Sequence, residues 1–466
     1  MEGLHTGINE VIWVTSAYLL AYAVPLLITG RLGDRFGPKN LYLIGLVIFT
    51  LSSAWCGLSA DVGQLIAARA VQGLGASMMT PQTMAIITRI FPPDRRGQAM
   101  GLWGSVAGVA TLVGPVLGGL LVDGLGWEWI FFINLPIGVV AFVMAVKLVP
   151  KLQTHPHRFD IPGVVLNAVG MFLLVFGIQE GESYKWGTIV GPISVWSLII
   201  AGLVVLAIFL VWQRINHKGE PLLPLSLFRD RNFALGNAAI STVGFTVTSF
   251  SLPLIFFLQL VLGFTPTESA LMMVPMAVLN TLLAGPVGRL VDRVNPSFVA
   301  FTGAALLGIS LVWYSMLLAP GVAFEWLLLP SAVMGLANAC IWSPISTTVT
   351  RNLPQAQAGA GSGVYNTTRQ FGSVLGSAAV AALIQVRLSV ELPGIETGQH
   401  GFGGTLPESM QAGFSAAMAQ TLLLPAATVF LCAIIVLFFA KPKQTVAWVQ
   451  QGQPAPGDEP AESALD

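Results

Sequence analysis

The chain has 466 residues, of which 54% are hydrophobic and only 9% are charged, and its formal net charge is zero. A soluble protein of this size carries about 25% charged residues, so the composition excludes a soluble globular protein and indicates one that lies in a lipid bilayer. The balanced charge argues against a nucleic-acid partner.

Apolar segments of about 20 residues, the length that crosses a bilayer as a helix, follow one another along the chain. We therefore expect an all-α, polytopic membrane protein with thirteen spans. The expected spans are 11–30, 40–60, 63–88, 98–122, 128–148, 161–181, 192–213, 232–260, 267–288, 297–318, 324–349, 360–386 and 413–440. Residues 452–466 are acidic and rich in proline, and we expect the whole cytoplasmic tail at 442–466 to be disordered.

Lysine and arginine are distributed unevenly between the loops. When the N-terminus of the chain is placed outside, 18 of the 22 Lys and Arg residues fall in inside segments. Two, Lys185 and Arg387, fall outside, and two, Arg69 and Arg369, lie within spans. Cytoplasmic loops carry an excess of Lys and Arg. The pattern therefore predicts a cell (plasma or inner) membrane protein whose N-terminus is outside and whose C-terminus is cytoplasmic.

Two parts of the chain repeat each other. The segment GLGASMMTPQTMAIITRIFPPDRRGQAMG (73–101) aligns with GLANACIWSPISTTVTRNLPQAQAGAGSG (335–363), and GRLGDR (30–35) aligns with GRLVDR (288–293). Internal repeats of this kind predict two similar helical bundles that face each other. The expected organisation is an N-terminal bundle of five spans at 1–150, two linker spans at 151–230 and a C-terminal bundle of six spans at 231–441.

The two expected bundles differ by one helix. In the second bundle, the span at 232–260 precedes the helix that ends in GRLVDR, whereas no span of this sequence precedes the helix that ends in GRLGDR. The difference predicts a further helix before Met1, which would bring the number of spans to fourteen.

The loop GRLGDRFGPK (30–39) has the composition of a charged latch. Asp34 can pair with an arginine and complement the N-terminus of a helix, and such a pairing would hold one conformation of the protein and break in another. The alternative is a basic turn that only fixes the topology. The candidate residues of this motif and its repeat are Gly30, Asp34, Arg35, Gly37, Lys39, Asp292 and Arg293.

Several segments resemble, in chain order, the motifs of one family. GRLGDRFGPK (30–39), LIAARAVQGLGAS (65–77) and GVATLVGPVLGG (108–119) resemble motifs of the major facilitator superfamily, and the last of these is typical of antiporters. WEWIFFINLPIG (127–138), the linker pair and GVYNTTRQFGSVLG (363–376) resemble its fourteen-span drug:proton antiporter branch. The resemblance implies the major facilitator fold, with two pseudo-repeated bundles and a two-helix linker, lacking the first helix of the family.

The resemblance also implies a function. It is that of a secondary active transporter that exports drugs or other small amphipathic molecules by alternating access, driven by the proton gradient. We expect no cofactor, no metal and no nucleic acid, a small-molecule substrate and the lipid bilayer as partners, and a monomer. We do not expect an enzyme, because the sequence contains no G-x-x-x-x-G-K-[ST] run and no nucleophile–base set. The alternatives are a carrier for uptake or facilitated diffusion of a metabolite, and a truncated, non-functional remnant of a transporter.

Two arginines lie inside expected spans, where a charge costs about 2.5–3.5 kcal/mol at the bilayer centre. Arg69 is expected to face the bundle interior, and the resemblance assigns it to proton coupling; the alternative is a side chain that reaches out to water. Arg369 is expected to contact substrate or another helix, or to be a structural hydrogen-bonding residue. No Asp or Glu falls in the middle third of an expected span, although the resembling family commonly carries an acid on its first helix.

Small residues are concentrated in one span. They are Gly104, Gly108, Gly114, Pro115, Gly118 and Gly119. The resemblance implies a bend near the cavity that limits leak, while close packing of helices explains the same residues equally well.

Aromatic, amide and methionine side chains are candidates for the lining of a cavity, because they suit bulky and varied apolar ligands. Helix packing or lipid contact is the alternative for each of them. The candidates are Trp13, Tyr18, Tyr22, Gln72, Met78, Met79, Gln82, Trp103, Asn338, Trp342, Tyr365 and Asn366.

Overall fold

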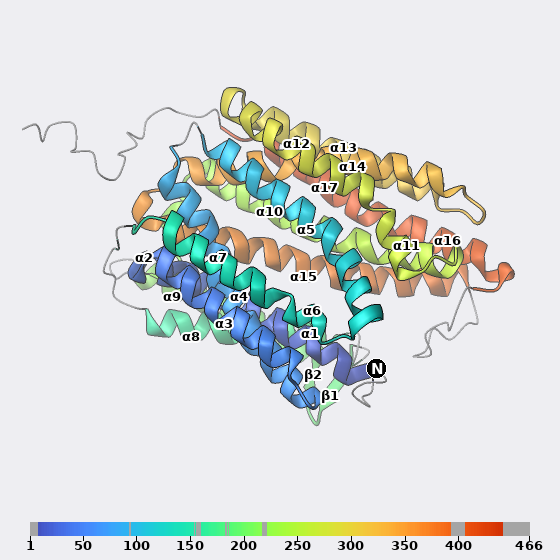
Figure 1. Cartoon of the computed structure of the whole chain (residues 1–466), viewed down its shortest axis with the longest axis horizontal. Coiled ribbons are helices and arrows are strands. Elements are labelled where there is room, and N and C mark those ends of the chain that lie inside the picture. The colour runs from blue at the N-terminus through green and yellow to red at the C-terminus, as the bar shows by residue number, and fades with distance from the viewer. Residues whose placement is uncertain are drawn as a thin grey trace, which may run out of the picture.

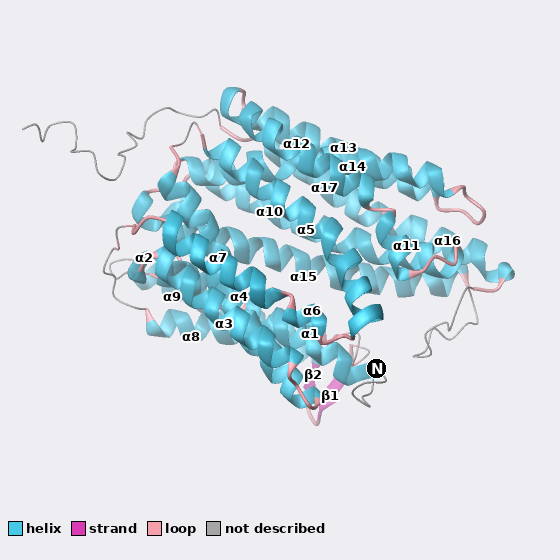
Figure 2. Ribbon diagram, in the orientation of Figure 1, coloured by secondary structure: helices cyan, strands magenta, loops and turns pink. Residues whose placement is uncertain are grey.

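A computed structural model describes residues 8–92, 95–152, 154, 160–181, 184, 186–216, 221–392 and 406–440. These residues are almost entirely helical, as Figure 2 shows in cyan, which confirms the predicted all-α class. The predicted tail at 442–466 lies outside the described residues.

We name the helices by the three parts of the chain that the sequence predicts, a first bundle, a linker and a second bundle, and keep these names for the same residues below. The first bundle contains α1 (Ile8–Ala23), α2 (Leu26–Phe36), α3 (Pro38–Gly57), α4 (Val62–Ile90), α5 (Arg96–Leu125), α6 (Trp129–Phe132) and α7 (Asn134–Leu148). The linker contains α8 (Ile161–Gln179), the strands β1 (Thr188–Val190) and β2 (Ile193–Ser194), α9 (Val195–Ile215) and the short helix η2 (Leu225–Arg229). The second bundle contains α10 (Arg231–Phe256), η3 (Phe257–Val261), α11 (Pro266–Leu271), α12 (Val274–Arg293), α13 (Pro296–Leu317), α14 (Phe324–Arg351), η4 (Gln355–Gln357), α15 (Ala358–Glu391), α16 (Glu408–Thr421) and α17 (Leu423–Leu437).

Each of the thirteen expected spans coincides with a helix or with an interrupted pair of helices. Ten helical stretches of the described residues are long and apolar enough to cross a membrane, and α1 with α2 makes an eleventh if the bent pair counts as one span. The two remaining expected spans are α4 and α5, with 29 and 30 residues. They are outside that group of eleven, so the number thirteen stays a prediction.

Two expected spans differ in detail from the helices. The span expected at 11–30 is two helices that continue to Phe36 with a bend of 45° between them. The bend lies at Pro25, which has no N–H to bond the carbonyl of the preceding turn. The span expected to start at residue 192 starts at Val195 instead, because Ile193 and Ser194 pair with β1 in a small antiparallel hairpin. Figure 2 shows this hairpin in magenta near the N-terminal end of the chain.

The long helices of the two bundles are interleaved. Helix α5 of the first bundle packs mainly on α12 of the second, and α15 of the second bundle packs on α2 of the first as well as on its neighbour α10. In Figure 1, α5, α10 and α15 run between the group of α12, α13 and α14 and the group of α3, α4 and α8. This interleaving brings residues of both bundles to a common centre.

A carboxylate joins the two linker helices. Asp160, at the start of α8, accepts hydrogen bonds from Trp212 Nε1 (2.9 Å) and Gln213 Nε2 (2.7 Å) of α9. The backbone N–H groups of Gly163 and Leu222 also donate to it. Burial raises the pKa of this carboxyl, but the hydrogen bonds to its ionised form outweigh burial, so its pKa lies below the usual range.

Candidate functional site

The loop motif at 30–39 lies where α2 of the first bundle meets the first turn of α15 of the second. Asp34 is fully buried, and its carboxylate accepts the backbone N–H groups of Gly359 and Ala360, each at 2.8 Å. Arg89 of α4 donates to the same carboxylate. Free N–H groups and the helix dipole at an N-terminus favour a negative charge there. Asp34 therefore joins α2, α4 and α15.

The repeat of the motif makes the reciprocal junction. Asp292, at the end of α12, accepts the backbone N–H groups of Gly97 (2.8 Å) and Gln98 (2.9 Å) in the first turn of α5. In the sequence repeat, Gly97 and Gln98 align with Gly359 and Ala360. Each bundle thus supplies the carboxylate that holds a helix of the other. We call the two sites the Asp34 junction and the Asp292 junction.

Glycines allow the helices to cross closely at both junctions. A Cβ atom added at Gly30 would lie 2.5 Å from the carbonyl oxygen of Gly359, and one added at Gly288 would overlap the carbonyl of Gly97. Real Cβ contacts of that kind do not occur without a shift of the backbone. The glycines at these positions are therefore required by the approach of one helix to another.

The other residues of the loop motif and its repeat lie at the ends of α2 and α12 and at the start of α3. Gly37 ends α2 with φ +90°, a conformation that favours glycine. Lys39 donates to the carbonyl of Val146 (2.8 Å) near the C-terminus of α7, where a cation complements the helix dipole. Arg35 is partly buried at the end of α2, and Arg293 is exposed at the end of α12.

Arg96 was not among the residues predicted from the sequence, yet it ties the bundles together. It is 2% exposed, and its guanidinium donates to the carbonyls of Thr88 (2.8 Å) in α4 and Thr350 (2.6 Å) in α14. A cation is favoured at a helix C-terminus. The sequence held one indication of this role. In the repeat, the residue aligned with Arg96 is Ala358, so Arg96 has no counterpart in the repeated loop and must have another reason for its place.

The two arginines expected inside spans are linked by aromatic side chains of α1. Arg69 of α4 donates to Gln72 Oε1 at 2.7 Å, and its Cζ lies 4.1 Å from the ring centroid of Tyr18. The ring of Tyr18 stacks on that of Tyr22, with centroids 6.2 Å apart. Arg369 of α15 donates to Tyr22 Oη at 3.3 Å. A continuous line of side chains therefore runs from the first bundle to the second.

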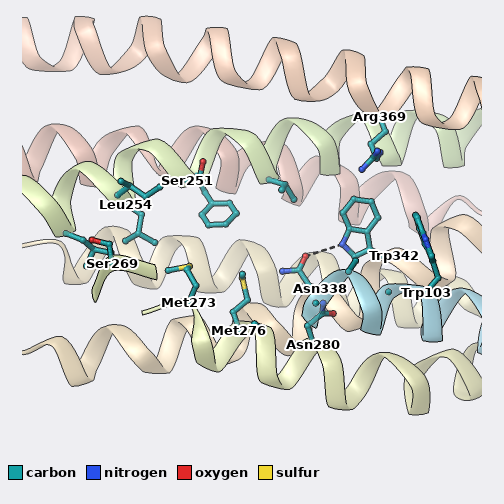
Figure 3. A pocket seen from close by; sticks show the side chains of 18 residues that line it. Trp103, Ser251, Leu254, Ser269, Met273, Met276, Asn280, Asn338, Trp342 and Arg369 are labelled. Carbon is teal, nitrogen blue, oxygen red and sulfur yellow. Dashed lines mark hydrogen bonds between the residues drawn. The ribbon is translucent and has the colours of Figure 1, made fainter. Parts of the chain in front are cut away.

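A cavity of about 440 Å³ lies between α5, α10, α12, α14 and α15 (Figure 3). Its wall is mainly apolar, and Arg369 is the charged residue among the side chains that line it. Trp342 Nε1 donates to Asn338 Oδ1 at 3.4 Å, as the dashed line in Figure 3 shows. Other lining residues are Trp103, Phe250, Ser251, Leu254, Ser269, Met273, Met276 and Asn280.

Three of the residues expected to line a cavity do so: Trp103, Asn338 and Trp342. Gln82 and Asn366 lie deep in the protein, where they donate to backbone carbonyls. The candidates outside the lining are Trp13, Tyr18, Tyr22, Gln72, Met78, Met79, Gln82, Tyr365 and Asn366. The apolar wall from α10, η3 and the start of α12 was missed, because its Leu, Phe and Met residues look in sequence like those that face lipid.

The small residues of α5 take different positions along the helix. Gly104 and Gly108 line the cavity. A Cβ atom at Gly118 or Gly119 would make ordinary contacts at 3.9 and 3.6 Å, and one at Gly114 would meet nothing within 4 Å. At Pro115 the structure describes the uninterrupted helix but not the side chain.

Comparisons with known proteins agree with this geometry. A family model described as Major Facilitator Superfamily matches residues 1–377. The chain is 49% identical over 444 residues to an uncharacterized MFS-type transporter, Rv1250, of Mycobacterium tuberculosis, a match that covers 94% of this chain and 76% of that protein. It is 32% identical over 399 residues to the tetracenomycin C resistance and export protein of Streptomyces glaucescens, covering 84% of this chain and 72% of that protein.

The fold also resembles a solved structure. The crystal structure of the human organic anion transporter MFSD10 (TETRAN) superposes with a TM-score of 0.61 at 17% sequence identity, over 90% of this chain and 83% of that one. At this identity the likeness concerns the fold alone. Because the family match covers most of the chain, and relatives match along most of their length, the chain belongs to the major facilitator superfamily and is a multi-pass membrane transporter.

Proposed function

We propose that this transporter exports small amphipathic molecules such as drugs across the plasma (inner) membrane, in exchange for protons and as a monomer. The observation that carries the proposal is the apolar cavity of about 440 Å³ between helices of both bundles. Such a cavity buries most of the surface of a drug-sized ligand. The relative named for tetracenomycin C resistance and export supports the direction of transport.

Transport by alternating access requires a conformational change, and we propose that the two junctions control it. We propose that 1–150 and 231–441 rock against each other, that 151–230 is a linker, and that the junctions are closed in the state seen here and broken in the opposite state. A hydrogen bond to a charged group contributes about 1.5–3 kcal/mol. Differences of that size are within reach of ligand binding, which shifts such an equilibrium by its differential affinity for the two states.

The direction of opening follows from the predicted topology. Both junctions lie in loops that the Lys and Arg distribution places on the cytoplasmic side. With the C-terminus in the cytoplasm and the N-terminus of this chain outside, closed junctions correspond to a cavity that is shut towards the cytoplasm. Substrate would be released to the outside from this state.

We assign Arg69 to the coupling of transport to protons, through the groups that it holds. A guanidinium stays protonated in proteins, so Arg69 acts by positioning Gln72 and Tyr18 rather than by exchanging a proton itself. The second candidate function is facilitated diffusion without protons. One observation favours it: no Asp or Glu falls in the middle third of an expected span.

Transport into or out of proteoliposomes separates these functions. The purified full chain is reconstituted, and the flux of a fluorescent amphiphile is followed with and without an imposed pH gradient and with an uncoupler. We expect the gradient to accelerate flux, and both the uncoupler and Arg69→Gln to remove the acceleration. Arg229→Ala, at an exposed position of η2, is the matched control and should keep it. Flux that ignores the gradient would show a facilitated carrier instead.

A further inference from the structure

The residues that line the cavity carry charge of one sign only. Of the eighteen residues that line it, Arg369 is positively charged and none is Asp or Glu. On the basis of the proposed transport function, we propose that the substrates are amphipathic anions, which carry a carboxylate, sulfonate or sulfate on an apolar body, and that Arg369 binds the anionic group.

Arg369 has donor capacity to spare. Its Nη2 makes one long hydrogen bond, 3.3 Å to Tyr22 Oη, and its Nε has no hydrogen-bond partner among the described residues. A guanidinium presents five N–H donors in a planar fork. That fork matches two oxygens of a carboxylate or sulfonate, which it binds through two parallel hydrogen bonds. A bound anion would thus satisfy donors that the protein leaves open.

Three acids are buried elsewhere among the described residues, and one of them, Glu180 at the end of α8, does not line the cavity. Asp34 binds Arg89 and the first turn of α15, and Asp160 binds side chains of α9. Neither residue lines the cavity. A charge in an apolar site is unfavourable without a counter-charge. The cavity therefore favours a ligand that brings a negative charge and disfavours one that adds a second positive charge beside Arg369.

The two ends of the cavity differ in a way that orients such a ligand. In Figure 3, Arg369, Trp342 and Trp103 lie at one end, and Leu254 and Met273 lie towards the other. The guanidinium Cζ is 5.8 Å from the ring centroid of Trp342. The anionic group would lie at the tryptophan end. The apolar body would extend among methionine side chains, which adapt their shape to varied ligands.

A matched set of probes tests the charge preference. The probes are 1-pyrenebutyrate, the neutral 1-pyrenebutanol and pyrenebutyl-trimethylammonium, which share the same apolar body. Binding to the purified full chain in lipid nanodiscs is followed by energy transfer from tryptophan to pyrene, with empty nanodiscs as the blank. We expect the anion to bind about tenfold more tightly than the alcohol, and the cation to bind most weakly.

Three variants test whether Arg369 is the source of the preference for the anionic probe. Arg369→Gln should weaken the anion about tenfold and leave the alcohol unchanged, which also shows that the cavity is intact. Arg369→Lys keeps the charge but loses the planar fork, so its affinity for the anion should lie between those of the wild type and Arg369→Gln. Arg387→Gln removes an arginine of the same helix that does not line the cavity, and it should change nothing.

The outcomes separate this inference from the proposed function. A cation that binds as tightly as the anion, an anion affinity that Arg369→Gln leaves unchanged, or no binding of any probe would overturn the inference. Flux of the same probes in proteoliposomes reports on transport independently. Flux of the alcohol or cation without anion preference overturns the inference and supports transport, whereas Arg369-dependent anion binding without flux of any probe supports the inference and contradicts transport.

Discussion

Helices α5 and α15 occupy equivalent places in the repeat, and they are alike at one end and different further along. Each begins at a carboxylate of the other bundle, Asp292 for α5 and Asp34 for α15. Further along, Gly114 and Gly376 align at the same sequence offset as the rest of the repeat. A Cβ atom at Gly376 would lie 2.8 Å from Cα of Phe245 in α10, whereas one at Gly114 would meet nothing within 4 Å.

The difference shows that a repeated residue reproduces a contact only where its partner is repeated as well. Both acids of the junctions have a helix N-terminus to hold, because those helices belong to the repeat. Helix α10 packs closely on α15, but among the described residues no helix takes the corresponding place against Gly114. Glycine content therefore indicates where helices can approach, and the structure decides where they do.

The largest effect is expected from Asp34→Asn, which breaks the more buried of the two junctions. The substitution removes the negative charge that faces Arg89, a residue that is 3% exposed. Breaking a buried ion pair from one side costs about 3–5 kcal/mol. The free energy of unfolding of the purified protein, measured by titration with a denaturing detergent, should fall by that amount. A loss below about 1 kcal/mol would contradict the role of this junction.

Asp292→Asn should cost less, and the difference between the two variants sharpens the comparison. Asp292 accepts two backbone N–H groups as Asp34 does, but it is only partly buried. Water therefore replaces part of what is lost, and we expect about 1.5–3 kcal/mol in the same titration. Equal losses for both variants would show that the two junctions contribute equally to the free energy of unfolding despite their unequal burial.

Alanine at the aligned glycines tests the part where the helices differ. Gly376→Ala should lower the free energy of unfolding by about 1–3 kcal/mol, because the added methyl group overlaps the backbone of α10. Gly114→Ala is the matched control, and since its site is open it should change stability by less than about 1 kcal/mol. Similar losses at both positions would mean that α5 is also closely covered in the working protein.

Asp160, a buried carboxylate outside the repeat, provides a reference for the stability losses of the two junction variants. Asp160→Asn removes an acceptor of hydrogen bonds from α9 and should cost about 1–2 kcal/mol near neutral pH. Because the pKa of Asp160 is lower in the folded state, its contribution is present above the unfolded pKa of about 3.9 and is lost as the pH falls through the folded pKa. Wild type and variant should therefore converge in acid, and a constant difference at all pH values would contradict the shift.

The repeat in the sequence was sufficient to pair Asp34 with Asp292, and the composition of the loop was sufficient to expect Asp34 near an arginine and a helix N-terminus. It was not sufficient to show that each acid holds a helix of the opposite bundle. An alignment says which residues are equivalent, but it does not say which of two equivalent helices a residue meets.

The intramembrane arginines show the same limit. Hydropathy alone placed Arg69 and Arg369 inside spans. Their link through Tyr18 and Tyr22 depends on how α1 is rotated about its axis and on the bend at Pro25, neither of which the hydropathy of the sequence determines.

The reciprocal junctions have the contact pattern of a symmetric dimer. In a two-fold interface, a residue of one subunit contacts a second residue of its partner, and the partner returns the same contact. Here Asp34 contacts the first turn of α15, and Asp292 returns the contact to the first turn of α5. A chain severed between α9 and α10 would leave each fragment with one carboxylate and one receptive helix end, and the carboxylate of either fragment would meet its helix end only on the other. The interface between the bundles therefore has the approximate two-fold symmetry of a homodimer interface, although both halves belong to one polypeptide.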